Sequence, residues 1–186
     1  MVEELDLHIL DLVQNAIGAG ARTIEISCRD DEVPNRMTLR VKDDGRGMSV
    51  EMLQAIEQGF FSTKTPCAVG LGIPLLRQTA EHCGGGLTIE SVPGEGTTVT
   101  ATFRADHVDL PPFGDLPATY LSILATSEDR RIRIDHRCGG KELFVDTAEI
   151  ASLLGEVPMQ HPEVIGFLRD YLEQALGGTD EAGRSA

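Results

Sequence analysis

Residues 37–48 constrain the fold more than any other stretch, because they join an alternating strand to a glycine-rich turn. Apolar and polar side chains alternate here, which predicts a strand whose buried face carries Met37, Leu39 and Val41. Asp43 falls on the same buried face, whereas Asp44 has the opposite parity and should face solvent. Burying a carboxylate is costly unless other groups donate hydrogen bonds to it, and no neighbouring residue in the sequence does so.

Gly45 and Gly47 follow this strand directly and give the turn conformational freedom. Glycine readily takes positive φ angles, and its missing Cβ lets a flat ligand approach the backbone closely. One hypothesis is therefore a nucleobase pocket with Asp43 at its floor. The alternative is a surface turn, because Asp-Gly is a common turn dipeptide.

Residues 5–17 predict a helix with an apolar stripe next to a polar face. The stripe consists of Leu5, Ile9, Leu12, Val13 and Ala16, and the polar face of His8, Asp11, Asn15 and Gly18. Asp11 and Asn15 lie one turn apart, so both side chains can contact one bound object. Their hard oxygen atoms suit Mg²⁺ or a water that attacks phosphorus. The alternative is a solvated polar face, and His8 alone suggests only a helix-surface histidine.

A second helix is predicted to begin near Ile73, directly after a loop that contains Lys64, Gly70 and Gly72. Pro74 belongs in its first turn because proline lacks an amide hydrogen, and the predicted inward stripe is Leu75, Leu76, Thr79, Ala80 and Cys83. Free N–H groups at a helix start behind glycines form a ready anion site, to which Lys64 adds a charge. The alternative is a flexible loop with an incidental lysine.

Two pairs of strands complete this part of the chain. Residues 22–28 alternate and should form a hairpin with the strand that ends at Asp43, burying Ile24, Ile26 and Cys28. Residues 87–92 and 97–103 form the second pair. Their alternation turns Thr97 inward, beside the pocket proposed for Asp43. A core threonine bonded to backbone is the alternative.

The chain has 186 residues and a formal net charge of −14, from 16 basic and 30 acidic side chains. Its length suits one domain with an appendage, or two small ones. The charge argues against a nucleic-acid partner, because phosphate binding needs clustered Lys and Arg. No apolar run approaches the roughly 20 residues that cross a bilayer, and the acidic start is unlike a secretory signal. We therefore expect no membrane association and a cytoplasmic location.

The four cysteines, Cys28, Cys67, Cys83 and Cys138, are widely spaced and include no Cys-x-x-Cys pair. This spacing indicates neither a zinc site nor a dense disulfide framework. Reduced thiols are the expectation for a cytosolic chain.

Four short blocks, residues 11–16, 43–47, 60–64 and 70–73, are weak signals alone but informative in this order. They resemble the N box, first glycine box, F box and second glycine box of the GHKL superfamily, the Bergerat-fold ATPases, which includes DNA gyrase B, histidine kinases and MutL. The resemblance covers residues 5–104. Residues 94–97 and the helix and glycine run before them resemble histidine kinases in particular, whereas residues 15–21 are more similar to MutL.

This resemblance implies an α+β fold, a two-layer α/β sandwich with helices on one face of a mixed, mostly antiparallel sheet. It implies that Asn15 binds the Mg²⁺ that bridges the phosphates of ATP, and that Asp43 accepts a hydrogen bond from the adenine amino group. Other contacts to the base would come from Gly45, Gly47, Met48 and, through an ordered water, Thr97. Contacts to the phosphates would come from Lys64, Gly70, Leu71 and Gly72, with residues 62–70 as a short lid.

The chain departs from the family pattern at Asp11 and Gly18. The gyrase and MutL branches have a glutamate, which activates water, where this chain has the shorter Asp11, and MutL-like proteins have an aspartate at the position of Gly18. General-base catalysis depends on reach, so hydrolysis should be slow or absent. Histidine kinases carry their phospho-accepting histidine on an upstream helical hairpin, and only seven residues precede His8. We therefore do not expect a self-contained sensor kinase.

The predicted domains are an ATP-binding domain at 1–105, a linker at 106–117, an appendage at 118–176 and a disordered tail at 177–186. The appendage should have the order α-β-β-α-α, with a hairpin of strands 131–137 and 141–146. A cap at Asp146 should open its second helix, and Pro162 its last, whose stripe is Ile165, Leu168, Leu172 and Leu176.

The apolar stripes of the appendage need a partner surface, either on the ATP-binding domain or on another chain, as in a homodimer. Four arginines, Arg130, Arg131, Arg133 and Arg137, form the only basic cluster, which is either a solvated face or a docking site.

Two functions follow from these expectations. The first is a stand-alone, histidine-kinase-like ATPase domain that binds ATP and Mg²⁺ and regulates an unidentified protein partner by phosphotransfer in trans or slow hydrolysis. Asp11 would then be the catalytic residue. The alternative is a non-enzymatic, ATP-gated protein-binding module, such as an anti-sigma-like protein or an assembly regulator.

Overall fold

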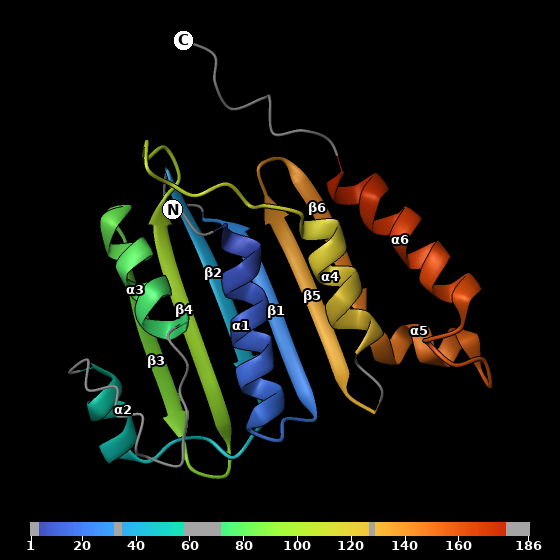
Figure 1. The fold of residues 1–186 in the computed structure, drawn as a ribbon, viewed down its shortest axis with the longest axis horizontal. Coiled ribbons are helices and arrows are strands. Elements are labelled where there is room, and N and C mark those ends of the chain that lie inside the picture. Colours follow the sequence, from blue (N-terminus) through green and yellow to red (C-terminus); the bar gives the residue numbers. More distant parts are fainter. Residues whose placement is uncertain (1–3, 32–34, 58–71, 127–128, 178–186) are drawn as a thin grey trace.

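The computed structural model describes residues 4–31, 35–57, 72–126 and 129–177. Their strands form one six-stranded sheet in the order β3-β4-β2-β1-β5-β6 (Figure 1). The strands are β1 (Thr23–Asp30), β2 (Arg36–Asp43), β3 (Gly86–Val92), β4 (Gly96–Arg104), β5 (Arg131–Cys138) and β6 (Lys141–Asp146). The helices are α1 (Leu5–Gly18), α2 (Val50–Glu57), α3 (Gly72–His82), α4 (Leu116–Ala125), α5 (Thr147–Leu154) and α6 (Pro162–Leu176).

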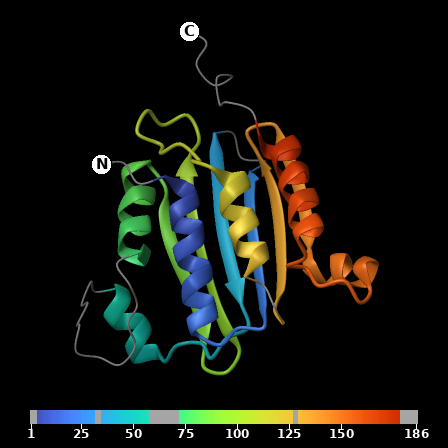
Figure 2. The same cartoon turned by 45° about the vertical axis from the view of Figure 1, so that its right-hand side comes forward.

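Helices α1, α3 and α4 lie against the same face of the sheet, and α6 lies beside α4 and β6 (Figures 1 and 2). All strand pairs are antiparallel except β1 with β5, which is parallel. The structure therefore confirms the predicted α+β class, with a mixed, mostly antiparallel sheet and helices on one face. None of the helices within the described ranges is both long and apolar enough to span a membrane.

The pairing of β2 places this strand between β1 and β4. β2 forms the predicted hairpin with β1, in which Ile24 lies opposite Asp43. On its other side β2 pairs with β4, so that Asp43 lies opposite Thr97 and Val41 opposite Val99. Two segments more than fifty residues apart thus meet at one end of the sheet.

The predicted inward faces of the strands and of α1 are buried. All predicted apolar positions of β1, β2 and α1 belong to the core, namely Ile24, Ile26, Cys28, Met37, Leu39, Val41, Leu5, Ile9, Leu12, Val13 and Ala16. The prediction for His8 was wrong, because this residue is only 2% exposed and lies in the interior with that stripe. Its position three residues after Leu5 and one before Ile9 brings it to the edge of the apolar stripe.

The inward stripe of α3 is shifted from the prediction. Leu75 is 39% exposed, while Ile73, Leu76, Ala80 and Cys83 are buried. The helix begins at Gly72, so Ile73 lies inside its first turn and leads a stripe at intervals of three, four and three residues. Leu75 lies about 100° around the helix from Leu76 and therefore faces outward.

The segment between β4 and α4 is anchored to the start of α1. The first amide groups of that helix donate to the carbonyls of Pro112 and Phe113. The carboxylate of Asp6, only 4% exposed, accepts from the amide of Asp115 and the hydroxyl of Thr119. Sequence reasoning missed this role, because Asp6 lies next to the apolar stripe and its partners are more than one hundred residues away.

The C-terminal elements occur in the predicted order, and β5 and β6 form the predicted hairpin. β5 also pairs with β1, from Thr23 with Arg131 to Arg29 with Arg137, so these strands extend the central sheet. Whether residues 118–176 act as a separate unit stays a prediction. On α6, Val164 is buried in place of Ile165, next to Leu168, Leu172 and Leu176. The predicted tail lies outside the described residues from 178 onward.

The arginines of β5 are paired with acidic groups. Arg131 and Arg133 form ion pairs with Asp146, and Arg137 forms one with Asp135. Asp146 also caps α5 as predicted, accepting from the amide of Ala148 at 3.0 Å. Cys28 and Cys138 are buried free thiols on neighbouring strands, with their Sγ atoms 3.0 Å apart.

Candidate functional site

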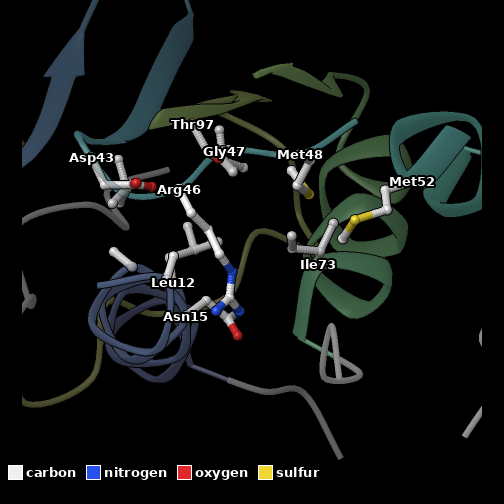
Figure 3. A pocket seen from close by; sticks show the side chains of 13 residues that line it. Leu12, Asn15, Asp43, Arg46, Gly47, Met48, Met52, Ile73 and Thr97 are labelled. Carbon is white, nitrogen blue, oxygen red and sulfur yellow. The ribbon is translucent and has the colours of Figure 1, made fainter. Parts of the chain in front are cut away.

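A pocket of about 110 Å³ opens where β2 ends and β4 begins, between α1 and the start of α3 (Figure 3). Five of the predicted site residues line it, namely Asn15, Asp43, Gly47, Met48 and Thr97. Sequence reasoning did not name the rest of the lining, which consists of Leu12, Ala16, Ala19, Val41, Arg46, Met52, Ile73 and Val99. Most of these residues are apolar, so the pocket suits a largely apolar group that makes few polar contacts.

Asp43 is the buried carboxylate of this pocket, only 9% exposed. It accepts a hydrogen bond from the amide of Gly45 at 2.8 Å, and it forms no ion pair within the described part of the chain. Burial raises the pKa of Asp43, although backbone hydrogen bonds from Gly45 and Thr97 partly oppose this rise. The carboxylate therefore retains acceptor capacity for a ligand that donates a hydrogen bond.

Asp44 faces solvent, as its position in the alternating strand predicted, and does not line the pocket. It is exposed, and its carboxylate accepts from the amides of Arg22 at 2.7 Å and Thr23 at 2.8 Å. These bonds tie the turn after β2 to the start of β1. Neighbouring aspartates thus serve different purposes, one holding the turn and one facing the pocket.

Two glycines allow the turn to pack tightly on the β3–β4 connection. Gly47 has φ +64°, and a Cβ at this position would lie 2.0 Å from the carbonyl oxygen of Val92. Gly96 has φ +114°, and its Cβ would lie 1.9 Å from the carbonyl oxygen of Asp43. Gly45 does not need a positive φ, but its Cβ would lie 2.8 Å from the Asp43 carboxylate. The missing Cβ atoms, predicted to let a ligand approach, here let two segments of the protein's own backbone lie against each other.

Ser91 connects the two sides of the pocket and was not predicted. Its hydroxyl accepts from the amide of Met48 at 2.8 Å and lies 2.9 Å from the hydroxyl of Thr97. It also donates to the carbonyl of Gly96 at 2.9 Å. Strand parity could have identified it, because Ser91 shares a face of β3 with the buried Leu87.

Asp11 and Asn15 interact with each other at the second end of the site. The Asn15 amide donates to the Asp11 carboxylate at 3.2 Å. A Cβ at Gly72 would lie 1.6 Å from Oδ2 of Asp11, so this carboxylate lies against the first residue of α3. The N-terminal end of a helix attracts negative charge, which explains a carboxylate at this position. Among the described residues no cluster of three His, Cys, Asp or Glu side chains could hold a metal ion.

Arg46 is the cation of the pocket. Its exposed side chain runs past Leu12 toward Asn15 (Figure 3). Its backbone is fixed at both ends, because its amide donates to Ala19 and its carbonyl accepts from Gly94. Three predicted residues, Lys64, Gly70 and Leu71, lie outside the described residues, so the structure neither supports nor opposes their roles.

An apolar pocket with one buried carboxylate, built on a mixed sheet with helices on one face, is the arrangement of a GHKL-type ATP-binding domain. Residues 2–107 match the family described as histidine kinase-, DNA gyrase B-, and HSP90-like ATPase, and the chain belongs to this family. The family match confirms the resemblance suggested by the four sequence blocks. It identifies an ATP-binding, histidine-kinase-like ATPase domain.

Known proteins similar to this region include sensor kinases. The sensor histidine kinase ZraS of Klebsiella oxytoca is 37% identical over an alignment of 103 residues that covers 53% of this chain and 21% of that protein. The sensor protein BceS of Halalkalibacterium halodurans is 36% identical over an alignment of 107 residues that covers 55% of this chain and 32% of that protein. The non-motile and phage-resistance protein of Caulobacter vibrioides is 33% identical over an alignment of 110 residues that covers 54% of this chain and 13% of that protein. This chain thus corresponds to a minor part of each relative.

Proposed function

We propose that the chain binds ATP with Mg²⁺ and regulates a partner protein, by phosphotransfer in trans or by slow hydrolysis. The observation that carries this proposal is the Asp43 carboxylate. It is buried in an apolar pocket, its pKa is raised by that burial, and within the described residues no cation neutralises it. A ligand with a hydrogen-bond donor on a flat ring, such as the amino group of adenine, would satisfy it.

The residues around Asp43 have properties that suit the rest of a base site. Met48 and Val99 offer apolar surface to the ring, and Thr97 offers a hydroxyl at the same level of the sheet. Gly45 and Gly47 have no side chains, which lets the turn lie close to the strands. Thr97 would act through an ordered water, because its hydroxyl already lies near Ser91.

The phosphates would extend from this pocket toward Asn15, Arg46 and the start of α3. Asn15 would supply an amide oxygen to Mg²⁺, which neutralises phosphate charge when it is bound. Arg46 and the helix start at Gly72 would attract the phosphates. Lys64, Gly70 and Leu71 complete the proposed phosphate contacts on the basis of family resemblance.

Asp11 decides between turnover and binding alone. It lies within hydrogen-bond reach of Asn15 and against Gly72, near the proposed phosphates. If it reaches a water beside the terminal phosphate, it can act as a general base. If it does not, the same site serves the second candidate, an ATP-gated binding module without catalysis. The hydrogen bond to Asn15 favours a structural contribution from Asp11 in either case.

Calorimetry with ATP, with and without Mg²⁺, tests nucleotide binding, and phosphate release with transfer of the terminal phosphate to co-purified proteins tests catalysis. Asp43→Ala is the control that should weaken ATP binding and, with it, phosphate release and transfer. Asp11→Asn preserves size and should lose turnover while retaining ATP binding. Absence of both phosphate release and transfer by the unaltered chain would exclude the enzyme, and absence of ATP binding would exclude both candidates.

A further inference from the structure

An apolar groove of about 450 Å³ lies at the β6 edge of the sheet, between α5 and α6. Its apolar lining includes Ile150, Leu153, Leu154, Val164, Phe167 and Tyr171. The groove shares no residue with the pocket that contains Asp43. Figure 1 shows α5 and α6 at one edge of the molecule and α2 and α3 at the other.

Several large apolar side chains of this groove are exposed. Leu153 is 88% exposed and Phe167 is 69% exposed, while Phe144 and Tyr171 are 45% and 40% exposed. The rings of Phe167 and Tyr171 are stacked, with centroids 6.5 Å apart and planes inclined by 3°. A contiguous exposed apolar surface with aromatic residues is typical of a protein interaction site.

The charges at this groove have one sign. Every charged residue that lines it is acidic, namely Asp146, Glu149 and Glu163. Asp146 is already paired with Arg131 and Arg133. Glu149 and Glu163 are exposed and form no ion pair within the described part of the chain. All charged side chains that line the groove are therefore negative, although Glu149 also attracts the nearby Arg131.

We propose that this groove binds an amphipathic α-helix of a partner protein, with apolar residues on one stripe and Lys or Arg at the edges of that stripe. Apolar side chains would fill the space beside Phe167 and Leu153, and the basic residues would lie opposite Glu149 and Glu163. The fifteen-residue α6 is about 22 Å long, enough to lie alongside four turns of a partner helix.

The same charges disfavour a second copy of this chain as the occupant. A symmetric dimer through this groove would place two acidic rims face to face, in a chain whose net charge is −14. The proposal does not depend on nucleotide binding, because the groove and the pocket lie on different elements.

Two labelled helical peptides of equal length test the proposal with the full chain. The first has a leucine stripe flanked by lysines, and the second has the same stripe flanked by glutamates. Fluorescence anisotropy should show binding of the lysine peptide and at least tenfold weaker binding of the glutamate peptide.

Variants of the chain locate the binding. Phe167→Ser with Leu153→Ser should weaken the lysine peptide at least tenfold, and Glu149→Lys with Glu163→Lys should weaken it severalfold. Val108→Ser and Glu81→Lys change exposed residues elsewhere and should leave the affinity unchanged. ATP titrations of the same variants should be unchanged, which separates this result from failure of the nucleotide site.

Three results would overturn the proposal. One is no binding of the lysine peptide, and another is an equal loss of binding with Glu81→Lys, which would indicate non-specific attraction to an acidic protein. The third is concentration-dependent dimerisation in analytical ultracentrifugation that Phe167→Ser abolishes, which would make a second copy the occupant.

Discussion

Two strands of this sheet end in a buried aspartate, and the two carboxylates differ in almost every other respect. Asp43 ends β2 and Asp146 ends β6, with 9% and 3% exposure. Asp146 receives hydrogen bonds from Arg131 and from the amide of Ala148, whereas Asp43 receives hydrogen bonds from backbone groups alone and forms no ion pair within the described ranges. The hydrogen bond from Arg131 holds the pKa of Asp146 low, and burial raises the pKa of Asp43.

The difference distinguishes a structural carboxylate from one that is available to a ligand. Asp146 gains stabilising contacts on folding, so its charge contributes to the stability of the fold. Asp43 loses hydration without full compensation, so its charge opposes folding and favours binding of a hydrogen-bond donor. Changes at the two sites should therefore act on different properties, stability at one and affinity at the other.

The largest expected effect is on stability, from Asp146→Ala. This change leaves Arg131 and Arg133 without their shared partner and removes the cap of α5. Breaking a buried pair costs about 3–5 kcal/mol, and because Arg131 is half exposed we expect about 3 kcal/mol in urea unfolding. ATP affinity of the folded variant should not change. A loss of affinity at full stability would contradict the assigned role.

The next effect concerns His136, which is buried on β5 and lies 3.3 Å from the hydroxyl of Tyr120. Burial lowers its pKa from 6.5 to about 4. Between these values the unfolded chain binds a proton that the folded chain does not, so stability falls as pH decreases from 6.5 to 4. The total loss should be about 3 kcal/mol. Unfolding curves of His136→Gln should lack this part of the pH dependence, and an unchanged slope would exclude His136 as its source.

In the pocket, Asp43→Ala should weaken ATP binding without lowering the free energy of unfolding. Loss of a hydrogen bond between a base and an ionised carboxylate costs about 1.5–3 kcal/mol, or roughly 10–150-fold in affinity. Because the buried charge is also removed, the free energy of unfolding should stay equal or rise. Calorimetry and urea unfolding of the same preparation measure both, and Asp44→Ala is the matched control, expected to affect stability first.

The sequence predicted that Asp43 is buried, because the position of a residue in an alternating strand decides which face of the sheet its side chain lies on. It also predicted the capping role of Asp146, but neither the burial of that residue nor its arginine partners. Those partners depend on how β5 and β6 pair, and on the parallel contact between β5 and β1 that completes the sheet.

Sequence pattern alone also failed to predict the exposure of His8 and Leu75, because it depends on where a helix begins and what packs on it. The pattern also missed Ser91 and Arg46, because their contacts come from segments far apart in the chain. Local pattern identified the strands, helices and glycine turn, while tertiary pairing decided which polar groups are satisfied.

The pH dependence of base binding should follow Asp43 alone. Adenosine carries no phosphate, so its affinity should fall as the pH decreases through the raised pKa of Asp43, where the carboxylate becomes protonated, and should level off near the affinity of Asp43→Ala. The decline should therefore begin above the pH range in which an exposed aspartate titrates. Asp43→Asn should bind adenosine weakly and with no such dependence. A decline that persists in Asp43→Asn would assign it to another group.

The smallest expected effect separates the two ends of the nucleotide. Arg46→Ala removes an exposed cation that points toward Asn15, and an exposed charge contributes about 0.3–1 kcal/mol to binding. ATP affinity should therefore fall twofold to fivefold, less at high salt, while adenosine affinity stays unchanged. Lys42→Ala removes an exposed cation of β2 that does not line the pocket, and is the control. Equal losses for ATP and adenosine would show that Arg46 shapes the base pocket. Arg46 would then belong with Asp43, as a residue that serves ligand binding, and not with Asp146, which serves stability.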